Sequence, residues 1–98
     1  MVVALLEENP VMTAELYDRV RERLDLEHEP AAGLLFHAAG PAGGSWIAYD
    51  VWETPEAWDR FREDRLMAVV QEVFAAAGLA PPPPHRQEVF ELHAMVPR

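Results

Sequence analysis

Hydrophobic and polar positions follow two different spacings along the chain, and these spacings predict strands and helices. Four stretches are mostly apolar, or alternate between apolar and polar residues, as strands do: 2–8, 34–39, 45–53 and 87–96. Apolar residues recur at helical spacing between Leu16 and Leu24, and a second helical pattern begins at Pro55. The predicted element order is therefore βαββαβ.

This order predicts an α+β fold of the ferredoxin-like type, in which a four-stranded antiparallel sheet carries its helices on one face. Local signals support both helix starts, because Thr13 and Thr54 are typical N-cap residues and Pro55 suits a first helical position. Residues 40–44 are dense in glycine and proline, so they predict a hairpin between the second and third strands.

The apolar side chains of the second helical region point in two different directions around the helix axis. Trp58 and Phe61 share one direction, whereas the apolar residues from Leu66 onward point elsewhere, rotated by roughly 100°. One straight helix does not bury both sets, so we expect a break or a bend within residues 62–66. Residues 81–84 are all proline and predict an extended spacer that returns the chain to the sheet.

The predicted sheet is apolar on both faces, although helices would cover only one. Val3 and Leu5 lie on one face of the first strand, and Val2 and Leu6 lie on the other. A second sheet from another copy of the chain is the simplest cover, so we expect a homodimer. The length of 98 residues suits a single domain, 1–98.

Charge and composition narrow the classes of partner. The chain has 17 acidic residues against 8 arginines, and its net charge is −9. Such a surface repels phosphate backbones and anionic lipids, so we expect neither nucleic acid nor membrane as a partner. Cysteine is absent, which excludes disulfides and thiolate chemistry, and the early apolar run is too short for a signal peptide. These features favour a cytoplasmic protein.

Three polar residues on the predicted strands are candidate catalytic groups: His37, Asp50 and His93. Histidine exchanges protons near neutral pH, and a buried carboxylate needs a partner such as an arginine or a histidine. The face that His37 occupies depends on the hairpin. A four-residue loop places it opposite Trp46, and a five-residue loop places it opposite Ile47. Packing of His37 in the core or the dimer interface, and a structural ion pair at Asp50, are the alternatives.

Aromatic residues gather where the third strand leads into the second helix. Trp46, Trp52, Trp58 and Phe61 are candidate ligand-binding residues, because together they could form a flat apolar slot for an aromatic compound. Plain core packing is the alternative. The two remaining histidines, His28 and His85, fall in predicted loops and are expected to be solvent-exposed. Since the histidines are dispersed and cysteine is absent, we expect no metal site and no cofactor.

Two segments carry a resemblance to a known family: GLLFHAAG at 33–40 and SWIAYDVWETPEAWDRFREDRLM at 45–67. The chain resembles the antibiotic biosynthesis monooxygenase-like proteins of the dimeric α/β-barrel superfamily. The resemblance implies a homodimer with a pocket between sheet and helices in each subunit. Some members oxidise aromatic polyketides with O₂ and no cofactor, some degrade haem, and others isomerise or cyclise. The haem-degrading members use a helical histidine, which neither predicted helix core contains.

Three functional hypotheses remain open at this point. The first is an enzyme, such as a cofactor-independent monooxygenase or a related isomerase or cyclase, that acts on a hydrophobic aromatic compound. The second is a dimeric ligand-binding or accessory protein that does not catalyse a reaction. The third is a structural dimer whose slot is filled by its own side chains.

Overall fold

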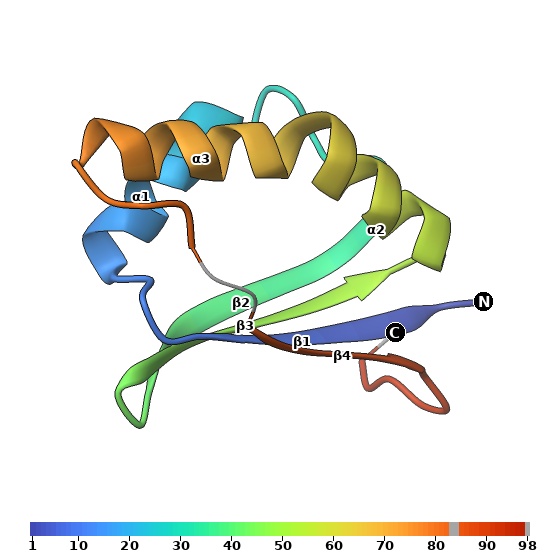
Figure 1. Cartoon of the computed structure of the whole chain (residues 1–98). Coiled ribbons are helices and arrows are strands. Elements are labelled where there is room, and N and C mark those ends of the chain that lie inside the picture. The colour runs from blue at the N-terminus through green and yellow to red at the C-terminus, as the bar shows by residue number, and fades with distance from the viewer. Residues whose placement is uncertain (83–84, 98) are drawn as a thin grey trace.

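The fold is a ferredoxin-like α+β arrangement in which helices cover one face of a four-stranded antiparallel sheet (Figure 1). The structure is a computed structural model and describes residues 1–82 and 85–97. The strands are β1 (Val3–Asn9), β2 (Leu34–Ala42), β3 (Ser45–Trp52) and β4 (Arg86–Glu91), in the sheet order β2-β3-β1-β4. The helices are α1 (Ala14–Leu24), α2 (Pro55–Phe61), the π-helical turn η1 (Arg62–Leu66) and α3 (Met67–Ala76). The predicted fold class is confirmed.

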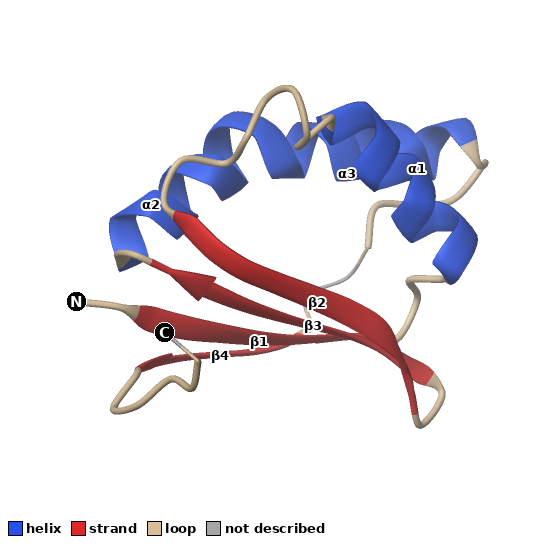
Figure 2. Ribbon diagram, turned by 180° about the vertical axis from the view of Figure 1, so that it is seen from behind, coloured by secondary structure: helices blue, strands red, loops and turns tan. Residues whose placement is uncertain are grey.

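Both helix starts have the predicted caps. The hydroxyl of Thr13 accepts a hydrogen bond from Leu16 N at 3.2 Å, and the hydroxyl of Thr54 accepts one from Ala57 N at 3.1 Å. Each cap satisfies one of the backbone N–H groups that a helix start leaves unpaired. The cap at Thr54 turns the chain directly from β3 into α2, which places α2 over the sheet (Figure 2).

The change of apolar direction in the second helical region corresponds to a change in helix type. Residues Arg62–Leu66 form the π-helical turn η1, which falls on the segment where a break or bend was expected. A π turn holds extra residues within a continuous helix, and it therefore rotates the residues after it relative to those before it. The helix continues through the turn, so the two apolar directions are reconciled without a loop.

The hairpin between β2 and β3 is tighter than either loop length considered from the sequence. Ala42 pairs with Ser45, and the turn consists of Gly43 and Gly44 alone, with φ angles of 57° and 81°. A two-residue hairpin turn of this kind needs positive φ at both positions, which glycine adopts without a steric penalty. As a result His37 lies opposite Asp50, so the expected pairings with Trp46 and Ile47 were wrong.

The last strand is shorter than predicted. β4 ends at Glu91, and the backbone N–H of Leu92 makes one further bond to the carbonyl of Val2. Its neighbour β1 begins at Val3, so the residues that follow have no strand to pair with. The predicted strand 87–96 therefore stops before His93. The proline spacer expected at 81–84 falls partly on residues 83 and 84, which lie outside the described residues.

The buried core divides into two clusters. One joins the sheet to α2 through Val3, Leu5, Trp52, Ala57 and Trp58. The other joins α1 to α3 and is made of helix residues alone: Leu16, Val20, Leu24, Val73 and Phe74. Phe61 and Leu66 pack against both clusters. Because α1 and α3 bury their apolar faces mainly against each other, the space between this helix pair and the sheet remains available for a cavity.

Candidate functional site

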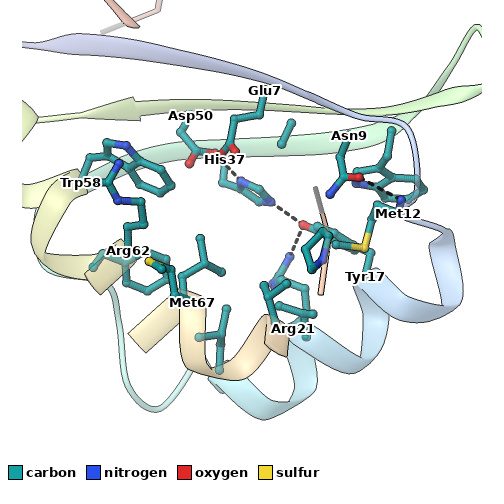
Figure 3. Close-up of a pocket in the computed structure, with 18 of the residues that line it drawn as sticks. Glu7, Asn9, Met12, Tyr17, Arg21, His37, Asp50, Trp58, Arg62 and Met67 are labelled. Carbon is teal, nitrogen blue, oxygen red and sulfur yellow. Dashed lines mark hydrogen bonds and ion pairs between the residues drawn. The ribbon is translucent and has the colours of Figure 1, made fainter. Parts of the chain in front are cut away.

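A cavity of about 510 Å³ lies between the covered face of the sheet and the helices (Figure 3). Its floor is formed by side chains of β1, β2 and β3, and its walls come from α1, α2, η1 and α3. Most of the lining is apolar, and polar side chains gather at a few places on the sheet and on α1. This volume and this character are typical of sites that bind a small molecule.

Asp50 is the buried carboxylate of the site, with only 7% of the residue exposed. It lies in the middle of β3, opposite His37 of β2 and Leu5 of β1. One of its oxygens is 2.5 Å from Nδ1 of His37, and the other accepts a hydrogen bond from Nε1 of Trp52 at 3.2 Å. These two bonds offset the cost of burying the carboxylate, and they fix the plane of the imidazole ring.

Tyr17 extends this hydrogen-bonded chain toward the helices. Its hydroxyl is hydrogen-bonded to Nε2 of His37, and Nη1 of Arg21 donates to the same hydroxyl oxygen at 3.3 Å. Arg21 only donates and an ionised Asp50 only accepts, so a neutral imidazole that donates from Nδ1 to Asp50 accepts at Nε2 from the hydroxyl of Tyr17. In this tautomer the hydrogen bonds run in one direction, from Arg21 through Tyr17 and His37 to Asp50.

The aromatic residues that were expected to form a slot lie together beside this chain. The ring centroids of Trp52 and Trp58 are 5.7 Å apart, and those of Trp52 and Phe61 are 5.5 Å apart. The guanidinium of Arg62, in η1, lies 5.8 Å from the centroid of the Trp58 ring. All of these residues line the cavity, and Trp52 and Trp58 also belong to the buried core, with 0% and 4% of their surface exposed.

Trp46 lines the other end of the cavity. Its ring centroid is 5.0 Å from that of Tyr17, so it supports the phenol ring from the sheet side. Its indole Nε1 is buried and has no hydrogen-bond partner among the residues that the structure describes. An unpaired indole N–H is a donor available to a bound ligand or to water.

A second group of polar side chains lies along β1. Nε2 of His85 is 2.9 Å from a carboxylate oxygen of Glu7, and both residues line the cavity. Asn9, two residues further along β1, lines it as well. The expectation that His85 is solvent-exposed was wrong, because its side chain is only 22% exposed. His85 immediately precedes β4, and the pairing of β4 with β1 brings the two residues together.

Six of the seven residues proposed from the sequence line the cavity: His37, Asp50, Trp46, Trp52, Trp58 and Phe61. The seventh, His93, lies after the end of β4, is exposed, and is not part of the cavity lining. The structure therefore joins His37 and Asp50 directly and keeps His93 apart from them.

Sequence reasoning missed Tyr17 and Arg21, which complete the hydrogen-bonded chain. One signal was available for Tyr17, since a phenol in the apolar stripe of an amphipathic helix brings a polar tip into the interior. Arg21 carried no such signal, because arginines at positions 19, 21 and 23 of the same helix look alike in sequence. Arg19 and Arg23 pair with Glu15 and Glu72, whereas Arg21 has no ion pair within the described part of the chain.

Residues 1–82 and 85–97 hold no group of three or more histidine, cysteine or acidic side chains that could bind a metal ion. No helix among them is long and apolar enough to cross a bilayer.

No family model and no curated protein matches the chain, whereas solved structures match it over nearly its full length. A point variant of SnoaB, a cofactor-independent oxygenase from Streptomyces nogalater, is 18% identical with a TM-score of 0.63, over 99% of this chain and 98% of that one. The heme-degrading protein from Mycobacterium tuberculosis is 22% identical with a TM-score of 0.58, over 98% and 99%.

A third solved structure, assigned to the antibiotic biosynthesis monooxygenases of Nitrosomonas europaea, is 13% identical with a TM-score of 0.61. It covers 96% of this chain and 100% of that one. The expected likeness to antibiotic biosynthesis monooxygenase-like proteins is thus confirmed in the fold. At such identities the activity has to be argued from the cavity, because one fold carries many chemistries.

Proposed function

We propose that this protein is an enzyme that binds a hydrophobic aromatic compound and removes a proton from it. The observation that carries the proposal is the directed chain of Tyr17, His37 and Asp50 beside an aromatic cavity. A histidine held by a carboxylate on one nitrogen is arranged to accept a proton at the other. Here that other nitrogen is reached through the hydroxyl of Tyr17.

Proton removal follows from the hydrogen-bonding capacity of Tyr17. Its hydroxyl donates to His37 and accepts from Arg21, which leaves one lone pair for a hydrogen bond from a ligand hydroxyl. When the ligand transfers its proton to Tyr17, the phenolic proton moves to Nε2 of His37, and Asp50 stabilises the imidazolium. The negative charge that develops on the ligand oxygen lies beside the guanidinium of Arg21, which stabilises it.

The anion formed in this way determines the reactions that follow. In the oxygenase reaction, a ring carbon of the resonance-stabilised carbanion gives an electron pair to O₂ and, after protonation, forms a hydroperoxide. Loss of water from a hydroperoxide that bears a hydrogen on the same carbon leaves a ketone. An isomerase or cyclase would use the same anion without O₂. The fold shared with a cofactor-independent oxygenase favours the first course.

The experiment is to measure O₂ consumption and product formation with a panel of polyphenols, for the wild-type protein and for His37→Ala. We expect the variant to lose between about 100-fold and 10,000-fold in rate, the usual contribution of general acid–base catalysis. His28→Ala is the matched control, because His28 is also bonded to an aspartate, at 2.8 Å, but on the exposed surface.

The outcomes separate the hypotheses. Product formation without O₂ consumption would favour the isomerase or cyclase. Saturable binding of polyphenols without any turnover would contradict the enzyme and favour the ligand-binding protein. Equal rates for wild type and His37→Ala would also contradict the role proposed for the hydrogen-bonded chain.

We also propose that the protein is a homodimer. The observation that supports the proposal is the open face of the sheet, where Phe36 is 50% and Phe90 is 46% exposed. Both lie on the side opposite the helices, because Phe36 pairs with Val51 and Phe90 pairs with Ala4. Exposed aromatic side chains gathered on one face are typical of a surface that packs against another protein.

A further inference from the structure

Glu7 and His85 form a second histidine–carboxylate pair in the same cavity as His37 and Asp50. Nε2 of His85 lies 2.9 Å from Oε2 of Glu7, and the two side chains are 22% and 18% exposed. The other oxygen of Glu7 has no hydrogen-bond partner among the described residues. That oxygen is open to a hydrogen-bond donor within the cavity, such as a hydroxyl group of a ligand.

The sheet register places the two pairs side by side on the cavity floor. Glu7 of β1 pairs with Ala48 of β3, two residues before Asp50, so Glu7 and Asp50 are diagonal neighbours on one face. Diagonal neighbours are about 7–8 Å apart. His37 lies one strand beyond Asp50, and β2 and β1 are about 10 Å apart because one strand separates them. Figure 3 shows Glu7 and Asp50 directed from the sheet toward the cavity.

Asn9 adds donors to the Glu7 end. Its side-chain oxygen accepts hydrogen bonds from the backbone N–H groups of Val11 at 3.0 Å and Met12 at 3.1 Å. These bonds fix the orientation of the amide, because only its oxygen accepts. The amide NH₂ group is therefore the end that remains for a ligand, and Asn9 lines the cavity.

We propose that Glu7, His85 and Asn9 form a second binding subsite, which receives a hydroxyl group at the far end of an aromatic ligand. The ligand class is accordingly a flat compound of two or more fused rings with hydroxyl groups at opposite ends. One hydroxyl meets Tyr17, and the other donates to Glu7. This inference rests on the proposed function for the Tyr17 end, and it adds a requirement for a second polar substituent.

Three naphthalene ligands test the subsite: 2-naphthol, 2,7-dihydroxynaphthalene and 7-methoxy-2-naphthol. Their affinities are measured by quenching of tryptophan fluorescence and by calorimetry. We expect the diol to bind at least 10-fold more tightly than 2-naphthol, which corresponds to one hydrogen bond to a charged group. A factor of two in this ratio of affinities is expected on statistical grounds alone, because the diol can bind in two equivalent orientations. The methoxy compound cannot donate at its second end and should bind no more tightly than 2-naphthol.

Glu7→Gln should remove the preference for the diol, because its second hydroxyl loses a charged acceptor, so the diol and 2-naphthol should then bind this variant with affinities within a factor of two of each other. Glu8→Gln is the matched control, because Glu8 is the next residue of β1, faces the other side of the sheet and pairs with Arg86 at 3.7 Å. Comparable far-ultraviolet circular dichroism verifies that both variants fold. The ligand series on the wild-type protein tests the subsite without any substitution.

Equal affinities of the wild-type protein for the diol and 2-naphthol would overturn the second subsite. Tighter binding of the methoxy compound than of 2-naphthol would also overturn it. So would an equal loss of affinity for the diol in Glu7→Gln and Glu8→Gln. The proposed function fails in a different way, through the absence of polyphenol turnover or its persistence in His37→Ala. The two failures are therefore distinguishable.

Discussion

Asp50 and Val51 are consecutive residues of β3, and they meet opposite environments. Asp50 points to the covered face, where it lines a cavity and bonds to His37 and Trp52. Val51 points to the open face and is only 3% exposed, since it lies between Phe36 of β2 and Ala4 of β1. One strand thus directs a carboxyl group toward the cavity and an apolar side chain toward the face opposite the helices.

The packing of the helices explains why the covered face carries a polar side chain and the open face an apolar one. On the covered face, α1 and α3 bury their apolar stripes mainly against each other, and the sheet below them can carry polar side chains around a cavity. On the open face Val51 and Ala4 are buried between Phe36 and Phe90, which themselves remain about half exposed. This difference in polarity between the two faces is why we propose chemistry on the covered face and association on the open face.

The strongest test of the covered face is Tyr17→Phe, because it removes one hydroxyl and keeps the ring. We expect polyphenol turnover to fall by about 100-fold or more, since the proton path to His37 is interrupted. Tyr49→Phe is the control on the open face, where Tyr49 packs against Phe36 with ring centroids 6.4 Å apart. Equal losses in the two variants would show that the faces do not differ in function.

The corresponding test of the open face compares two neighbours in β4. Val89 and Phe90 are 49% and 46% exposed, but Val89 lies on the side of the helices and Phe90 on the open side. Phe90→Glu should raise the dimer dissociation constant by about 100-fold, as expected when a central aromatic contact is replaced by a charge. Val89→Glu should leave it within a few-fold. Sedimentation velocity provides the measurement, and a wild-type protein that sediments as a stable monomer contradicts the dimer.

A third test asks how much stability the buried carboxylate contributes. Asp50→Ala leaves Nδ1–H of His37 and Nε1–H of Trp52 without their acceptor, so we expect a loss of about 2–3 kcal/mol in the free energy of unfolding. Asp50→Asn retains an acceptor oxygen and should lose less. Urea unfolding followed by circular dichroism gives both values. An alanine variant as stable as wild type would show that the cavity solvates these donors.

The sequence was sufficient for the fold because each element carries a local signal. The caps at Thr13 and Thr54 start the helices, and the two apolar directions around Phe61 and Leu66 locate the π-helical turn. The candidate site was only partly predictable, because it depends on long-range register. His37 faces Asp50 as a result of the Gly43–Gly44 turn, and Glu7 meets His85 across 78 residues of sequence. Neither contact leaves a pattern in the sequence.

The smallest expected effect concerns the turn that sets this register. Gly44 has a φ of +81°, whereas Gly40 has no positive φ, and a Cβ added to either would meet no atom within 4 Å. Gly44→Ala should therefore lose about 1 kcal/mol of unfolding free energy through backbone strain alone, and Gly40→Ala should change it by less. Urea unfolding measures both. Because neither glycine contacts the cavity, the affinity for 2-naphthol should be the same in both variants. A Gly44→Ala protein that folds normally but binds 2-naphthol much more weakly would contradict this expectation. It would show that the pairing of His37 with Asp50 in the folded protein depends on the conformation of the turn.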